Sequence, residues 1–182
     1  MIGIVSRLAD QKGFDLLQQI ADAIVREGAS LVVLGTGEER YSRFFLELQR
    51  RYPRYVGVKI AHDERLAHKI EAGSDMFLMP SRFEPCGLNQ IYSLKYGTVP
   101  IVRATGGLDD TVVDSTDPDE GDGFKFSTYS SEQLLNAVRR ALQVYQDQNR
   151  WQALMRRGMG QDFSWHRSAE RYLEVYQLLV LN

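Results

Sequence analysis

Apolar residues along the chain follow two spacings that alternate. Short, almost wholly apolar runs such as 2–6 and 75–79 predict β-strands, while segments such as 14–27, with an apolar residue at every third or fourth position, predict amphipathic helices. The predicted strands are 2–6, 30–34, 55–60, 75–79, 99–102 and 123–126. The predicted helices are 14–27, 38–51, 64–72, 88–96, 131–146, 150–160 and 166–180.

This alternation predicts an α/β fold: a doubly wound, Rossmann-like parallel sheet of about six strands, with extra helices at its C-terminal end. The central runs, such as 76–79, are apolar throughout, as strands covered on both faces are. In such sheets ligands bind at the carboxyl ends of the strands. The candidate binding loops at that edge are 7–13, 35–37, 61–63, 81–88 and 105–107.

One of these loops carries the most informative stretch of the chain, Pro80-Ser-Arg-Phe-Glu-Pro-Cys-Gly-Leu-Asn89. It joins an apolar strand to a new helix, so the backbone N–H groups of Gly87, Leu88 and Asn89 are expected to lack helical partners and to point at a phosphate. A carboxylate beside a phosphate repels it, so we expect Glu84 to face neutral sugar hydroxyls. The alternative is that Glu84 only complements the helix dipole.

Two cations, Arg7 and Lys12, flank the polar loop after the first predicted strand. Because that loop opens at the same edge of the sheet, both are predicted to reach the phosphates of a ligand, where each charge-assisted contact contributes roughly 1.5–3 kcal/mol. The alternative is a pair of solvated surface cations. Gly13, at the start of the next helix, favours the functional interpretation.

Weaker signals surround this candidate site. Thr105-Gly-Gly107 either allows close approach of the backbone to a ligand or simply turns the chain between a strand and a helix. His62 is able to stack on a base, whereas Asp63 is a good helix N-cap. Gly35-x-Gly37 lacks the third glycine and the acidic partner of a dinucleotide fingerprint, so it predicts a tight turn. Asp114, in a polar stretch, is expected to be solvated.

Charge and cysteine content narrow the class of protein. The formal net charge of −2 gives no basis for nonspecific binding to nucleic acid or to a membrane, and no apolar run is long enough for a transmembrane helix. The chain has a single cysteine, Cys86, so it cannot form an internal disulfide. This fits a reducing compartment, and we expect a cytoplasmic protein. Cys86 itself is interpreted as a small packing residue. Because no Asp-x-Asp pair follows a strand, we expect no metal ion and no cofactor.

Three ordered motifs together resemble one family. They are Ser6-Arg-Leu-Ala-Asp-Gln-Lys-Gly13, the 80–88 stretch quoted above, and Lys95-Tyr-Gly-Thr-Val-Pro-Ile-Val102 followed by Thr105-Gly-Gly-Leu108. These motifs are similar to those of bacterial glycogen synthases and plant starch synthases, and the match covers nearly the whole chain. The resemblance implies the C-terminal, Rossmann-like lobe of a GT-B glycosyltransferase, which binds ADP-glucose.

The resemblance also implies a role for each matched residue. Arg7 and Lys12 hold the phosphates of the donor and stabilise the ADP leaving group. Glu84 contacts the glucose that is transferred. The remaining implied contacts are the amides of Gly87 and Leu88 with Asn89 at the phosphates, Thr105, Gly106 and Gly107 along the donor pocket, and His62 at the adenine.

Two positions of the chain, His62 and Tyr92, depart from the family pattern, and one lobe of the family is missing. His62 stands where bacterial synthases have an aromatic residue, although an imidazole is also able to stack on a base. Many retaining GT-B enzymes carry a second glutamate eight positions after the first, where this chain has Tyr92, so ribose recognition by that carboxylate does not carry over. The N-terminal lobe, with its acceptor groove and catalytic histidine, is not in the sequence. We therefore expect residues 1–182 to be a single nucleotide-sugar-binding domain of a longer enzyme: a lobe over 1–160 and a helix over 161–182 that crosses to the missing lobe.

The function implied for the full enzyme is retaining transfer of glucose from ADP-glucose to an α-1,4-glucan, whose acceptor chain the missing lobe binds. The isolated lobe is expected to bind ADP weakly and to be inactive. Part of the apolar face of its last helix is expected to be exposed, or to be covered by self-association. Two alternatives remain open: the donor lobe of another retaining glycosyltransferase that uses a UDP- or GDP-sugar, and a freestanding nucleotide-binding module.

Overall fold

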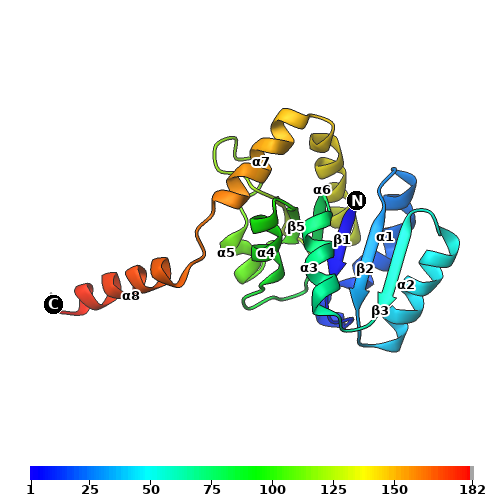
Figure 1. The fold of residues 1–182 in the computed structure, drawn as a ribbon, viewed down its shortest axis with the longest axis horizontal. Helices are drawn as coiled ribbons and strands as arrows, with labels where there is room; N and C mark the ends of the chain where they lie inside the picture. The colour runs from blue at the N-terminus through cyan, green and yellow to red at the C-terminus, as the bar shows by residue number, and fades with distance from the viewer. Residues whose placement is uncertain (181–182) are drawn as a thin grey trace.

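The computed structural model describes residues 1–180 and contains a six-stranded sheet in which all neighbouring strands run parallel. The strands are β1 (Ile2–Val5), β2 (Leu31–Gly35), β3 (Val56–Ile60), β4 (Met76–Met79), β5 (Val99–Arg103) and β6 (Phe124–Phe126). They lie in the order β3-β2-β1-β4-β5-β6 (Figure 1). The predicted α/β fold and all six predicted strands are confirmed.

Helices cover both faces of the sheet. They are α1 (Phe14–Arg26), α2 (Glu39–Arg51), α3 (Glu64–Gly73), α4 (Asn89–Tyr96), α5 (Gly107–Thr111), α6 (Ser131–Tyr145), α7 (Gln148–Gly160) and α8 (Trp165–Val180), with a 3-10 turn η1 (Asp10–Lys12). On one face α1 packs against α2 and α6, and on the other α4 packs against α3 and α5. The short elements α5 and η1 were not predicted as helices.

The strand order places a topological switch between β1 and β4. The chain moves outward from β1 to β2 and β3, and then returns to the other side of β1 to form β4, β5 and β6. The connections that follow β1 and β4 therefore lead to helices on opposite faces of the sheet, α1 and α4, and the carboxyl ends of the strands at such a point are where ligands bind. The motifs 7–13 and 80–88 are the two loops at this point.

The core follows the predicted helix faces. The apolar positions expected on the inner face of α1, namely Leu17, Ile20, Ala21 and Ile24, are all buried. Beside them the ring of Phe14 meets Tyr41 and Phe45 of α2 edge to face, with centroids 5.6 and 5.3 Å apart. This packing fixes the start of α1, which directly follows the loop after β1.

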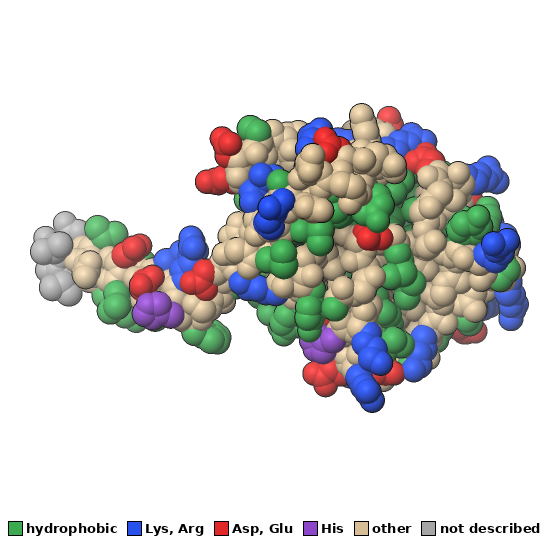
Figure 2. All heavy atoms as spheres, turned by 45° about the horizontal axis from the view of Figure 1, so that its top comes forward, with side chains coloured by type: hydrophobic (Ala, Val, Ile, Leu, Met, Phe, Trp, Pro, Cys, Tyr) green, Lys and Arg blue, Asp and Glu red, His purple; other side chains and the backbone are tan. Residues whose placement is uncertain are grey.

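Helix α8 leaves the body of the molecule and projects as an arm (Figure 1). Figure 2 shows hydrophobic side chains along this arm, interspersed with charged ones. Its large apolar side chains are exposed: Trp165, Tyr172, Leu173, Val175, Tyr176, Leu178 and Leu179. The expected exposure of an apolar face on the last helix is confirmed; residues 181 and 182 of the predicted segment lie outside the described residues.

The Thr105-Gly-Gly107 turn lies behind the 81–88 loop. A Cβ on Gly106, whose φ is 48°, would lie 2.3 Å from the carbonyl oxygen of Glu84. A Cβ on Gly107 would lie 2.0 Å from the carbonyl oxygen of Cys86, and the Gly107 amide donates to the carbonyl of Glu84 at 3.0 Å. Close packing against the 81–88 loop therefore explains why glycine occupies both positions. The sequence pattern did not indicate this contact, because the two loops are separate segments of the chain.

The polar stretch after α5 is more ordered than expected. Asp114 was predicted to be solvated, but its carboxylate accepts two hydrogen bonds from the guanidinium of Arg140, at 3.0 and 2.9 Å. Burial raises the pKa of Asp114, and the hydrogen bonds from Arg140 and from backbone amides outweigh it and lower the pKa to about 2. Asp122, fully buried, accepts from the Val113 amide at 2.8 Å. For Asp122 the effect of burial outweighs that of the hydrogen bonds and raises the pKa to about 6.

Replacing Gly107 with alanine is expected to lower the free energy of unfolding by about 1–3 kcal/mol, because the new methyl group has to displace the backbone of the 81–88 loop. Gly73 is a matched control, since a Cβ there meets nothing within 4 Å. Urea denaturation of Gly107→Ala and Gly73→Ala tests the packing argument. Equal stability of the two variants would contradict it.

The raised pKa of Asp122 predicts a pH dependence with a definite sign. A carboxyl group that binds its proton more tightly when folded stabilises the protein at low pH and loses that contribution as the pH rises through about 6. Asp122→Asn keeps an acceptor for the Val113 amide and cannot ionise. Relative to wild type, its free energy of unfolding should increase by on the order of 2–3 kcal/mol between about pH 4 and pH 7. A difference that stays constant across this range, in denaturant titrations, would refute the assignment.

Candidate functional site

A hollow of about 980 Å³ opens at the carboxyl edge of the sheet, over the crevice between β1 and β4. Its walls come from the loops after β1, β2, β3 and β4 and from the sides of α3 and α4. The predicted site residues that line it are Arg7, Lys12, His62, Glu84, Gly87, Leu88 and Asn89. Thr105, Gly106 and Gly107, expected along the pocket, do not line it; Gly106 and Gly107 lie behind the 81–88 loop.

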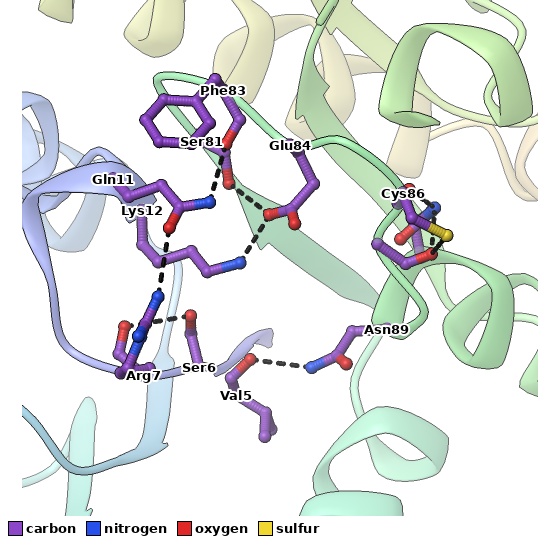
Figure 3. A network of polar contacts seen from close by, with 12 residues as sticks. Val5, Ser6, Arg7, Gln11, Lys12, Ser81, Phe83, Glu84, Cys86 and Asn89 are labelled. Carbon is purple, nitrogen blue, oxygen red and sulfur yellow. Dashed lines mark hydrogen bonds and ion pairs between the residues drawn. The ribbon is translucent and has the colours of Figure 1, made fainter. Parts of the chain in front are cut away.

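Lys12 and Glu84 meet directly in this hollow. Figure 3 shows the two side chains pointing toward each other. The ammonium of Lys12 lies 2.5 Å from Oε2 of Glu84. The hydroxyl of Ser81 donates to the same oxygen at 3.1 Å. The carboxylate is mostly buried, with 8% of the Glu84 side chain exposed against 20% for Lys12. The sequence assigned these residues to different parts of a ligand, and the structure pairs them with each other.

Arg7 lies at the outer end of the same loop. Its guanidinium donates to the Gln11 side-chain oxygen at 3.1 Å, and the Gln11 amide group donates to the carbonyl of Phe83 at 3.2 Å (Figure 3). The Arg82 amide in turn donates to the Gln11 carbonyl at 2.8 Å. Gln11 thus ties the loops after β1 and β4 together, a role that no local sequence signal indicated.

Gly13 permits this approach of the two loops. Its φ is 74°, a left-handed conformation that suits glycine, and a Cβ there would lie 1.9 Å from the carbonyl oxygen of Pro80. Any side chain at position 13 would therefore push the loop of Lys12 away from the end of β4. Close packing also explains the glycine at position 35, because a Cβ added there would lie 2.0 Å from the carbonyl oxygen of Ser6.

The N-terminus of α4 faces the hollow with free donors. Gly87 adopts a φ of 75°, and α4 begins two residues later at Asn89. Within residues 1–180, the amides of Gly87, Leu88 and Asn89 have no hydrogen-bond acceptor. The side chain of Asn89 instead donates to the carbonyl of Val5 at 2.9 Å, which joins the start of α4 to the end of β1 (Figure 3). Unpaired amides at a helix start are suited to an anion.

At the opposite end of the hollow lies the loop after β3. His62 is exposed there and belongs to the lining. Asp63 caps α3, accepting from the Leu66 amide at 2.9 Å, as its position in the sequence predicted. The hollow therefore has a cationic, donor-rich end at Lys12 and α4, and an imidazole at the other.

Four lining residues of α3 were not assigned to the site from sequence: Glu64, Ala67, His68 and Glu71. Glu71 is buried although it is acidic, and it shares the inner face of α3 with Ile70. A carboxylate at an inward position of an amphipathic helix is the signal that would have identified it. Tyr92 of α4 completes this wall of the hollow.

Comparison with known proteins agrees with this geometry. The chain is 59% identical to "Glycogen synthase" of Koribacter versatilis over 97% of its own length, and 49% identical to "Glycogen synthase" of Kosmotoga olearia. It spans less than two fifths of these relatives, 37% and 38% of their lengths. The catalytic domain of starch synthase IV from Arabidopsis thaliana, bound to ADP and acarbose, superposes with a TM-score of 0.87 at 35% identity, covering all of this chain and 38% of that one.

More distant structures share the fold alone. The C-terminal domain of a glycosyl transferase group 1 family protein (LpcC) from Francisella tularensis has a TM-score of 0.69 at 19% identity and covers 87% of this chain. The family model described as glycosyl transferases group 1 matches residues 1–157, which include every loop of the hollow. The resemblance to glycogen and starch synthases, read from the motifs, is thereby confirmed, and the chain belongs to the glycosyl transferases group 1 family.

Proposed function

We propose that this chain is the donor-binding lobe of a retaining glucosyltransferase, a glycogen or starch synthase, which transfers glucose from ADP-glucose to an α-1,4-glucan. The single observation that carries the proposal is the meeting of Lys12, Glu84 and the unpaired amides of α4 in one hollow at the switch point of the sheet. A diphosphate needs cations and amide donors, and a hexose needs a carboxylate that accepts from its hydroxyls.

In this proposal the diphosphate occupies the end of the hollow between Arg7, Lys12 and the start of α4. The amides of Leu88 and Asn89 donate to phosphate oxygens, and the helix dipole favours their negative charge. When the bond between glucose and ADP breaks, negative charge grows on the leaving diphosphate. The ammonium of Lys12 and the guanidinium of Arg7 stabilise that charge, which lowers the barrier. These groups supply positive charge from the chain itself, so the proposal includes no metal ion and no cofactor.

The pairing of Lys12 with Glu84 connects phosphate binding to sugar binding. A phosphate that draws the ammonium of Lys12 toward itself releases an oxygen of Glu84, which Ser81 continues to hold in place. That oxygen is then free to accept a hydrogen bond from a glucose hydroxyl. At the far end of the hollow, His62 stacks on the adenine.

The relatives support the identity of the substrates. The two proteins named glycogen synthase described above are 59% and 49% identical over nearly all of this chain, and the related starch synthase structure is described as bound to ADP and acarbose. The chain spans about 38% of those proteins, so we assign the α-glucan acceptor to the remainder of the enzyme. We likewise propose that α8 crosses to that remainder, and that the enzyme works in the cytoplasm. Residues 1–180 contain no helix long and apolar enough to span a membrane.

Calorimetric titration of the 182-residue chain with ADP, UDP and GDP, beside a glucan-elongation assay, tests the proposal. ADP is expected to bind weakly and more tightly than the other two nucleotides, and the chain alone is expected to elongate no glucan. Preference for UDP or GDP would indicate the donor lobe of a different glycosyltransferase. Glucan elongation by the chain alone would contradict the proposal that catalysis needs a second lobe. If no nucleotide binds, the assignment of the hollow as a nucleotide site is wrong.

Lys12→Ala is expected to weaken ADP binding about ten- to a hundredfold, on the order of 1.5–3 kcal/mol. Lys125→Ala is the matched control: Lys125 is 21% exposed, against 20% for Lys12, and is also paired with a carboxylate, Asp109, but it lies on β6, away from the hollow. Titrations are compared at a temperature at which circular dichroism shows all three proteins to be folded, since Glu84 loses a partner in the first variant. Equal loss in both variants would remove Lys12 from the phosphate site.

A further inference from the structure

The wall of the hollow formed by α3 and α4 holds an imidazole and a carboxylate that the proposed function does not use. Glu71 is 2% exposed, and His68 lies one turn earlier on the same helix with 42% of its side chain exposed. Both residues line the hollow together with Tyr92. A carboxylate so fully buried is costly unless it has a partner or a function.

The two side chains meet at one edge of the imidazole ring. Nδ1 of His68 lies 3.1 Å from Oε2 of Glu71, although the two atoms are not aligned as in a good hydrogen bond. Both atoms are buried, and neither has a hydrogen-bond partner elsewhere in residues 1–180. Burial raises the pKa of Glu71, and the neighbouring His68 partly opposes that shift. The carboxylate therefore fixes which edge of the ring faces inward.

The other edge of the ring is available to a ligand. In the part of the chain that the structure describes, Nε2 of His68 is neither among the buried unpartnered atoms nor in a hydrogen bond. Tyr92 and Tyr96 of α4 meet the ring edge to face, with centroids 5.6 and 6.2 Å away, and hold its orientation. The result is a positioned nitrogen at the wall of the hollow.

The chemistry of this nitrogen favours a hydroxyl. With Nδ1 turned to Glu71, Nε2 accepts a hydrogen bond when the ring is neutral and donates one when it is protonated. A hydroxyl fits both states, because it both donates and accepts. A phosphate oxygen only accepts, fits only the protonated ring, and is repelled by a charged Glu71.

The position along the hollow points to the middle of a nucleotide. His62 precedes α3 at one end, and the donor-rich start of α4 lies at the other. Since α3 packs directly against α4, His68 lies on the wall between these two ends. In a nucleoside diphosphate, the group between the base and the phosphates is the ribose, which carries two neighbouring hydroxyls.

We propose that His68 forms a hydrogen bond with a ribose hydroxyl of the bound nucleotide, that Glu71 positions the ring, and that the hollow thereby selects ribonucleotides over deoxyribonucleotides. This inference rests on the proposed nucleotide-binding function. It assigns ribose recognition to α3, on a side chain outside the 80–89 motif. His68 is a ligand contact and Glu71 a positioning residue.

The test compares titrations of the 182-residue chain with ADP, 2′-deoxy-ADP and 3′-deoxy-ADP. Wild type is expected to bind ADP about five- to tenfold more tightly than at least one of the deoxy analogues, the effect of one hydrogen bond. His68→Phe keeps a ring against Tyr92 and Tyr96 but has no nitrogen, and it should bring that ratio close to one. Glu71→Gln should reduce the ratio to an intermediate value. Lys12→Ala is the control, because it should weaken all three ligands equally and leave the ratio unchanged.

Each outcome decides a separate question. No binding of ADP to wild type refutes the nucleotide site itself. Binding with a ratio near one in wild type, or a ratio in His68→Phe equal to that of wild type, refutes ribose recognition by His68 and leaves the nucleotide site intact. An equal weakening of all three ligands by His68→Phe makes His68 a structural residue and also overturns the inference. Should Glu71→Gln fail to fold, the half-exposed His68 still decides the result.

Discussion

The close approach of two loops, those that follow β1 and β4, is the constraint on which the site depends. The backbone at Gly13 comes so near to the carbonyl of Pro80 that no side chain fits between them. Gln11 then bonds to both Arg82 and Phe83 across the same gap. Only because these backbones touch does the ammonium of Lys12 reach the carboxylate of Glu84, and a wider gap would leave two unconnected charged loops.

Most of the fold was predictable from local pattern. Apolar runs at β4 and spaced apolar residues on α1 gave the right elements, because period and burial are short-range properties of the sequence. The exposure of apolar side chains on α8 followed instead from the resemblance, which implies that this helix crosses to a second lobe. The location of the hollow followed as well, because parallel strands put all their carboxyl ends at one edge.

Contacts between distant segments were not predictable. Lys12 and Glu84 are 72 positions apart, and no local sequence pattern indicates that this cation and this carboxylate pair with each other. The role of Gly107 depends on the Cys86 carbonyl behind it, and Asp114 is held by Arg140 from a later helix. His68 and Glu71 were missed because one histidine on a helix is commonly structural, and only the packing of α3 on α4 brings the pair to the hollow.

The ion pair between Lys12 and Glu84 also bears on which molecules the hollow rejects. A sulfate ion, which has no hydroxyl to donate, has to separate the ammonium from its carboxylate and offers that carboxylate no hydrogen bond in return. A polyol without negative charge has donors for the carboxylate of Glu84, but it cannot draw the ammonium of Lys12 away from that carboxylate. Under the proposed function, a molecule that carries both an anionic group and hydroxyl donors satisfies both halves of the pair, so the whole donor is expected to be favoured over either of its parts.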